Sequence, residues 1–242
     1  MKASFFEAGF DETRCRYSLF DNSNGNVHDP YETFNTIRLN TIEPYVIFCH
    51  QDILINQGHG FNQLVQVIEE LDKLDPNWAV AGNAGINNNY EMVAKITDPC
   101  QTPNWSGVFP QQVHSLDENF LVIKTSADIS CSIELKGFHF YATDLCLNAI
   151  TKGYSSYVIN FHLTHLSAGN YNQTFHEVKA MFYKKWCSKF NLCYIKTVTC
   201  VTMCFSKYKL IRYLGSRSRI MQWFLSNRGA QILVIPRSQS AT

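Results

Sequence analysis

The sequence predicts an α/β fold in which short buried strands alternate with helices. Two apolar runs of strand length, residues 45–49 and 78–81, lie on either side of an amphipathic helical segment, residues 60–74. With 242 residues, 45% of them hydrophobic, the chain can bury one large core or at most two small ones. No apolar run approaches the roughly 20 residues that a membrane-spanning helix needs. A sheet with helices packed on it is therefore expected, and not a sandwich or a barrel.

The first half of the predicted sheet follows from hydrophobic patterning. Residues 45–49 (YVIFC) form a continuous apolar run after Pro44, which predicts a fully buried strand. Apolar residues recur at helical spacing over residues 60–74, and Pro76 ends that helix. Residues 78–81 predict a second buried strand. The Asn-, Pro- and Gly-rich segment 87–110 predicts a long loop.

The second half shows a similar alternation. Residues 119–125 (NFLVIKT) predict a strand, and residues 143–152 predict a helix that Thr143 caps and Gly153 ends. Residues 157–161 predict another strand, which leads into HLTH. Beyond about residue 172 the pattern becomes helical and basic, as expected for an appendage packed on the sheet.

The net charge of +1 conceals two oppositely charged parts. Residues 1–178 hold nine Lys/Arg and all twenty Asp/Glu, a net charge of −11, whereas residues 179–242 hold twelve Lys/Arg and no acid. Such a segment suits an anionic partner, for example acidic lipid headgroups, a phosphorylated substrate or a nucleic-acid backbone. Docking on the acidic part of the same chain is the alternative.

The nine cysteines indicate reduced, mostly buried thiols. Their number is odd, no CxxC motif occurs, and several lie within apolar runs. A disulfide framework or a zinc ribbon would have a different pattern.

Candidate metal ligands follow two of the predicted strands. His50 and Asp52 come directly after the strand at 45–49, and His162 and His165 follow the strand at 157–161. Open α/β sheets bind ligands at the carboxyl ends of their strands, and imidazole and carboxylate groups both bind divalent ions. A polar turn without a ligand is an equally good account of His50-Gln51-Asp52 alone.

Three further acids lie at edges of the predicted elements. Asp117 and Glu118 precede the strand at 119–125, where they suit either sugar hydroxyls or an ordinary loop. Asp144 lies in the first turn of the helix at 143–152. A carboxylate aimed at a pocket from there would accept a proton from an alcohol, although acids in a first turn also stabilise the helix dipole.

The order and spacing of seven segments resemble one enzyme family, the family-2-like nucleotide-sugar glycosyltransferases of GT-A fold, in the group named after a streptomycin-biosynthesis protein. The resemblance covers about residues 17–190. The segments are DNSNGN, PYETFNTIRLN, EPYVIFCHQDILI, LDPNWAVAGNAG, SLDENFLVI, GFHFYATDLCLNAITKGY and HLTH.

The resemblance implies a mixed sheet flanked by helices and a metal-assisted, inverting transfer of a sugar. His50 and Asp52 lie where the family has its Asp-x-Asp motif, which holds Mn²⁺ or Mg²⁺ on the donor diphosphate, and His165 matches a histidine that closes the metal site. Asp144 matches the acid that acts as general base. The remaining matches place Asp117 and Glu118 on the acceptor side and Asp21 and Asn22 against the nucleotide.

The same resemblance implies the partners, whereas the expected location follows from the cysteines and the basic segment. A nucleotide-sugar donor and a hydroxyl acceptor are implied, the acceptor being a glycan, a lipid-linked sugar or a small molecule. The protein is expected in the cytoplasm, with contact to the anionic inner membrane face through its basic segment. The expected division is a catalytic domain at residues 1–178 and a basic, mostly helical extension at 179–242.

Three departures from the family pattern are visible. His50 replaces the first Asp of the motif, and Thr143 stands where Glu is common. The family's first βα unit is expected to be absent, so that residues 1–10 form the end of its helix and residues 16–20 the following strand. An alternative is therefore a non-catalytic remnant that binds a nucleotide sugar.

Two other classes of protein share single features with this chain. Two histidines and an aspartate also form the ligand triad of non-haem iron oxygenases, which generally have an all-β fold with an Arg soon after the second His. The basic segment also carries aromatic residues, a combination that occurs in nucleic-acid-binding proteins; these are Tyr183, Trp186, Tyr208 and Trp223. No recognition module is discernible, and no nucleic-acid partner is expected.

Overall fold

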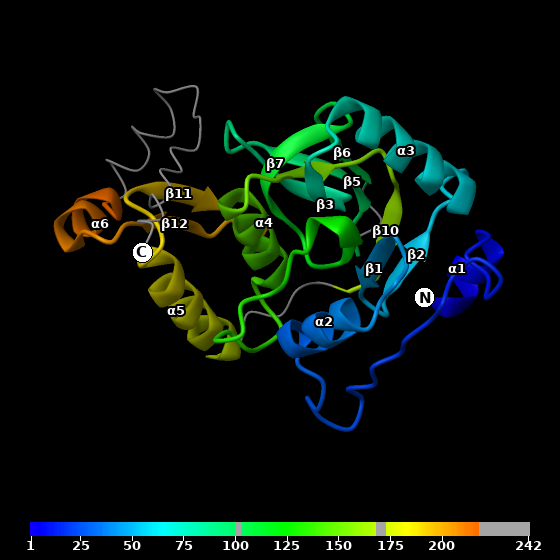
Figure 1. Cartoon of the computed structure of the whole chain (residues 1–242), viewed down its shortest axis with the longest axis horizontal. Coiled ribbons are helices and arrows are strands. Elements are labelled where there is room, and N and C mark those ends of the chain that lie inside the picture. The colour runs from blue at the N-terminus through cyan, green and yellow to red at the C-terminus, as the bar shows by residue number, and fades with distance from the viewer. Residues whose placement is uncertain (100–102, 168–172, 218–242) are drawn as a thin grey trace.

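The structure is a computed structural model that describes residues 1–99, 103–167 and 173–217. It is an α/β protein with one large mixed sheet flanked by helices and a small separate hairpin (Figure 1). Six α-helices are described: α1 (Lys2–Glu7), α2 (Pro30–Leu39), α3 (Phe61–Leu74), α4 (Tyr141–Thr151), α5 (Gln173–Cys187) and α6 (Lys209–Gly215). A 3₁₀ turn spans Thr125–Ala127.

The large sheet has ten strands, nine of them in the order β1-β8-β3-β9-β7-β4-β5-β10-β2, with β6 paired to β5. The pairs β3–β9 and β5–β10 are parallel and the other neighbours are antiparallel. The strands are β1 (Tyr45–Cys49), β2 (Ile53–Ile55), β3 (Trp78–Gly82), β4 (Ala84–Asn87), β5 (Met92–Thr97), β6 (Pro103–Ser106), β7 (Gln111–Leu116), β8 (Phe120–Lys124), β9 (Ser155–Val158) and β10 (Leu163–His165).

Helices cover both faces of this sheet because its central strands are apolar on both sides. Along β8, Leu121 and Ile123 join one core with α2, α4 and α5, whereas Phe120 and Val122 join a second core with α1 and α3. This alternation is the period-2 geometry of a strand. The molecule therefore has three layers, with the sheet in the middle.

The two end strands of the sheet are consecutive in the chain. β1 pairs with β8 at one end and β2 pairs with β10 at the other, yet only residues 50–52 separate them. A linker this short spans only about 10 Å when fully extended. The sheet therefore curves until its ends approach each other, and His50-Gln51-Asp52 joins them.

Most predicted elements are confirmed, and α3 begins and ends within one residue of its predicted bounds. The predicted strands at 45–49, 78–81 and 119–125 correspond to β1, β3 and β8. The strand expected at 157–161 is shifted toward the N-terminus as β9, and HLTH contains β10. β1 is half-buried along its length and not fully buried, because it is the last strand of the sheet.

Three local expectations are wrong. The long loop expected over residues 87–110 contains β5 and β6, because the Asn-rich residues 87–90 form a tight turn between β4 and β5. Residues 16–20 form no strand. Thr143 lies inside α4, which begins two residues earlier, after Phe140 in a left-handed conformation (φ 66°).

The segment after residue 178 is part of the main core. Trp186 of α5 and Phe190, both buried, pack with Phe205 against the α4 side of the sheet. A hairpin that was not predicted, β11 (Cys193–Lys196) and β12 (Thr202–Phe205), lies between α5 and α6. The described part of the extension is therefore both helical and β, and residues 218–242 lie outside the described residues.

The structure also bears on the predicted thiols and on membrane-spanning helices. The eight described cysteines are free thiols, and five of them are buried, as predicted; Cys100 lies outside the described residues. Among the described residues, none of the helices combines the length and the apolar character that crossing a membrane requires.

Candidate metal centre

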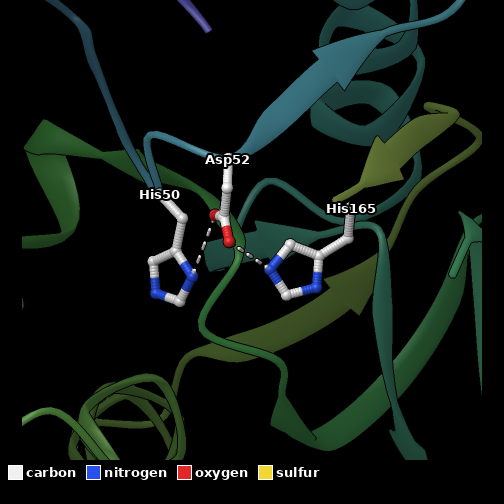
Figure 2. A group of neighbouring side chains, drawn as sticks. All are labelled: His50, Asp52 and His165. Carbon is white, nitrogen blue, oxygen red and sulfur yellow. Dashed lines mark ion pairs between the residues drawn. The ribbon is translucent and has the colours of Figure 1, made fainter. Parts of the chain in front are cut away.

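His50, Asp52 and His165 converge at the join between the two ends of the sheet (Figure 2). One ligand atom from each lies within 4.8 Å of the others. The Asp52 carboxylate lies between the rings, with Oδ1 3.9 Å from His50 Nδ1 and Oδ2 3.4 Å from His165 Nε2. His50 and Asp52 come from the β1–β2 connection and His165 from the end of β10.

Backbone hydrogen bonds fix both parts of this cluster. The His50 amide donates to the Asn119 carbonyl at 3.0 Å, which extends the β1–β8 ladder by one residue. The Leu166 amide donates to the Asp52 carbonyl at 2.8 Å, which continues the pairing of β2 with β10. Each ligand thus lies one residue beyond a paired strand or at its end, and the sheet itself positions the side chains.

A short hydrogen-bond chain sets the tautomer of His50. The Tyr141 hydroxyl donates its one proton to the Glu118 carbonyl at 2.9 Å and lies 2.9 Å from His50 Nε2. It must therefore accept from a protonated Nε2, and the lone pair of His50 is left on Nδ1, facing Asp52. Such a bond to the far nitrogen is the arrangement that orients histidines at metal sites.

The residues present fit a divalent metal ion. Within the part of the chain that the structure describes, Asp52 Oδ1 and His165 Nε2 are buried without a hydrogen-bond partner. Buried polar atoms without partners are costly, so a cation that uses both would remove the cost. Two imidazoles and one carboxylate suit Mn²⁺ and other transition-metal ions better than Mg²⁺, which prefers oxygen ligands.

Burial is the main factor that opposes protonation of His50. Burial lowers the pKa of the His50 imidazole, Asp117 and Asp52 act in the raising direction, and His165 lowers the pKa further. The net lowering keeps the ring neutral near pH 7, which is the form that binds a metal.

Asp117 and Glu118, predicted on the acceptor side, lie in the β7–β8 turn beside the cluster. Asp117 Oδ1 accepts from the Asn119 amide at 3.0 Å. Glu118 Oε1 accepts from the Phe140 amide at 2.8 Å, and burial and Asp117 raise the pKa of the Glu118 carboxyl to about 8. Glu118 is half-buried and borders a small pocket together with His139 and Thr143.

Asp144 differs from the expectation of a carboxylate aimed at a pocket. Its side chain is fully buried, and four groups donate to it at 2.7–3.0 Å: Ser132 N and Oγ, Asn148 Nδ2 and Trp186 Nε1. Burial raises the pKa of Asp144 to about 6 against the opposite effect of these bonds, so the group is ionised at neutral pH. It joins α4 to α5 and to the segment before α4.

The remaining candidates form hydrogen bonds away from the ligand triad. Asp21 accepts from the Ser23 amide, and both ends of the Asn22 amide bond to His28, so these residues organise their own loop. His162 contacts Asn56 and Thr97 at 2.8–2.9 Å. Of the two histidines in HLTH, His165 is the one that joins the cluster.

Sequence reasoning missed two residues at the centre. Tyr141 was not singled out, although it lies three residues before Asp144. Asn119 is buried, and neither end of its amide has a partner among the described groups. Asn119 is the first residue of the predicted strand at 119–125, and an Asn at a strand end is ordinary turn chemistry, so the sequence alone offered no sign of its buried amide.

Fold and cluster together define an α/β protein with a His–Asp–His candidate metal site at the edge of its mixed sheet. No family model matches the chain. The chain is 34% identical over 192 residues to a protein of Fuscovulum blasticum named "ATP synthase subunits region ORF 6", which covers 76% of this chain and 77% of that protein. The chain belongs to the family of this protein. The name states no activity.

Proposed function

We propose that this protein is a metal-dependent glycosyltransferase that moves a sugar from a nucleotide-diphosphate donor to a hydroxyl acceptor, with inversion. The observation that supports the proposal is the convergence of His50, Asp52 and His165. The resemblance to GT-A enzymes assigns these three residues to one metal site, and they come from distant parts of the chain. The mixed α/β sheet is compatible with a GT-A fold, which is itself part of the proposal.

The geometry suggests a role for each residue of the cluster and its neighbours. His50, Asp52 and His165 would hold the ion, with Mn²⁺ the better match to two imidazoles. The bound metal would neutralise charge on the leaving nucleoside diphosphate. Tyr141 keeps His50 Nδ1 available by holding the proton on Nε2. Asp117 adds negative charge near His50, which favours a cation at this place.

We assign proton transfer from the acceptor to Glu118 in preference to Asp144. Glu118 is half-buried beside a pocket, which makes it accessible to an acceptor hydroxyl, and with a pKa raised to about 8 its proton-accepting form increases as the pH rises through that value. Asp144 has no exposed surface, and its two oxygens are each held by two donors. The role of Asp144 as a base remains a prediction of the resemblance.

Calorimetric titration of the purified chain with Mn²⁺, and then with UDP and GDP in the presence and absence of Mn²⁺, tests the proposal. Asp52→Ala should weaken Mn²⁺ binding about 100-fold or more, because a ligand contributes at least as much as its supporting hydrogen bonds. The matched controls His176→Ala and Glu69→Ala change exposed residues on α5 and α3 and should leave binding unchanged.

The possible outcomes distinguish metal and nucleotide binding from catalysis of sugar transfer. Metal-dependent nucleotide binding that Asp52→Ala abolishes supports a donor site, and turnover of a donor sugar then completes the case. Binding without turnover of any donor would favour the non-catalytic remnant. Equal Mn²⁺ affinity in the wild type and Asp52→Ala contradicts the metal site and the proposed mechanism with it.

The same ligand triad also suits a non-haem iron oxygenase. Those enzymes generally have an all-β fold, whereas here α3 and α4 pack on opposite faces of a mixed sheet. The fold thus favours the transferase. Iron-dependent oxygen consumption by the purified protein would favour the oxygenase instead.

A further inference from the structure

Helix α6 turns its large apolar side chains outward. Leu210 is 69% exposed and Leu214 44%, and these residues are four apart and share one face of the helix. Tyr213 on the same side is 56% exposed. A surface helix normally buries such a face against its own protein. In the part of the chain that the structure describes, this apolar face stays exposed.

The opposite side of α6 is held on the β11–β12 hairpin through Gly215. A Cβ at this position would lie 2.5 Å from Cys204 Sγ and 2.8 Å from the Tyr194 hydroxyl, so only glycine permits the contact. The Tyr194 hydroxyl also lies 3.5 Å from the Gly215 carbonyl, to which it donates. The helix is thus docked by its smallest residue, and the leucines stay exposed. Figure 1 shows α6 at one end of the molecule, beside the β11–β12 hairpin.

Unpaired positive charge surrounds this apolar face. Among the described residues, four cations at or beside α6 form no ion pair: Lys207, Lys209, Arg212 and Arg217. Within the same residues, one ion pair joins the extension to the acidic part of the chain, between Lys185 of α5 and Glu134. Lys207 and Arg217 lie instead over the rings of Tyr208 and Tyr213, 4.9 and 4.6 Å from the ring centroids. Docking on the chain's own acids therefore does not account for these cations.

We infer that α6 and its flanking cations form a membrane-docking surface that binds anionic lipid headgroups. We define this surface as Lys207, Tyr208, Lys209, Leu210, Tyr213, Leu214 and Arg217. Exposed leucines insert among acyl chains, tyrosines favour the interface, and cations pair with acidic headgroups. The inference does not depend on the proposed glycosyltransferase activity.

A lipid surface fits these residues better than a nucleic acid does. Stacking on bases uses aromatic faces, but Lys207 and Arg217 lie over the two tyrosines. Leucines add nothing to phosphate recognition, whereas apolar area is what an interfacial helix contributes to membrane binding. The absence of any acid from residue 179 onward extends the attraction along the chain.

The test is flotation of the full chain with vesicles of phosphatidylcholine alone and of phosphatidylcholine mixed with phosphatidylglycerol. Wild type should float with the mixed vesicles, less so at high salt, and not with the neutral ones. Leu210→Ser/Leu214→Ser should lower partitioning about tenfold or more. Lys207→Glu/Lys209→Glu should lower it at least about 25-fold, since each lost cation accounts for about fivefold.

Matched controls are available on the same chain. Leu39→Ser/Leu74→Ser changes two leucines that are 72% and 62% exposed, and Lys73→Glu/Lys136→Glu gives the same change in net charge; both should float like wild type. Circular dichroism confirms that each variant is folded. The inference is overturned if the α6 variants float like their controls, if wild type binds RNA but no vesicles, or if the leucine pair alters only self-association in light scattering.

Discussion

Replacing Asp144 by Ala distinguishes a structural role of this carboxylate from a catalytic one. The geometry predicts a large loss of stability and no loss of Mn²⁺ affinity. Asp144 accepts four hydrogen bonds inside the core and has no exposed surface. A general base, in contrast, must reach the acceptor hydroxyl.

The size of the loss of stability depends on which of the four donors to Asp144 can form new hydrogen bonds in the variant. The Ser132 hydroxyl can rotate, and the half-exposed Asn148 amide can turn to water. The Ser132 amide and Trp186 Nε1 are buried and remain unsatisfied, at about 2 kcal/mol each. The variant no longer has to desolvate the Asp144 carboxylate, which offsets part of this loss, so the expected destabilisation is about 3 kcal/mol. That is a large fraction of the roughly 5–15 kcal/mol by which domains are stable.

Urea unfolding followed by circular dichroism measures the effect. With a slope of about 3 kcal/mol per molar urea for a chain of this size, the midpoint should fall by about 1 M. Glu69→Ala, an exposed site on α3, should change stability by less than about 0.5 kcal/mol. In a double-mutant cycle, Trp186→Phe should couple to Asp144→Ala by about 1 kcal/mol, because each removes the same bond.

The reasoning fails if Asp144→Ala unfolds at the wild-type urea concentration. If that variant also loses transfer activity while it retains donor binding, the resemblance has identified the base correctly. A destabilised variant with unchanged Mn²⁺ affinity and retained turnover supports the structural role and leaves Glu118 as the proton acceptor.

Two further predictions concern His50. Tyr141→Phe should weaken Mn²⁺ binding about 10-fold or more, because it removes the hydroxyl that holds the proton on Nε2; calorimetry checks this against Tyr157→Phe, and equal affinities would contradict the tautomer assignment. Mn²⁺ affinity should be full above the pKa of His50 and fall as pH drops through it, because the ligand is the neutral ring. Since burial lowers that pKa, the fall should begin below the ordinary value of 6.5, and titrations from about pH 8 to about pH 5 would reveal an earlier onset if the reasoning is wrong.

The elements that were predicted well are those whose hydrophobic pattern has one explanation. The segment that became α3 shows helical periodicity and is followed by a proline, so its bounds follow from local chemistry. The segment 87–110 failed because Asn and Gly mark both long loops and the tight turns of hairpins. Helix α2 was missed, although Asp29 accepts from the Tyr31 amide as its cap and Pro30 occupies its first turn, which are recognisable start signals.

The candidate site was predictable where strand ends determine it. His50 and Asp52 follow one readable strand, His162 and His165 follow another, and the resemblance selected His165; His50, Asp52 and His165 come together. Tyr141 and Asn119 were not predictable, because their contacts depend on how α4 and the β7–β8 turn pack against β1. Asp144 illustrates the opposite failure. An acid in a first helical turn has the same local pattern whether it faces a pocket or the indole of Trp186, and only the packing of α5 decides between them.

The position of the site explains why its parts had to be recognised together. β1 and β2 are consecutive in sequence but form opposite ends of the sheet, so the connection between them is held from two sides, by Asn119 next to β8 and by Leu166 after β10. The position of His50 therefore depends on one end of the sheet and that of His165 on the other, and Asp52 lies between them. A substitution that loosens either end should separate the ligands without touching them. A fall in Mn²⁺ affinity on such a substitution would distinguish a metal site held by the sheet from three polar residues that are merely neighbours.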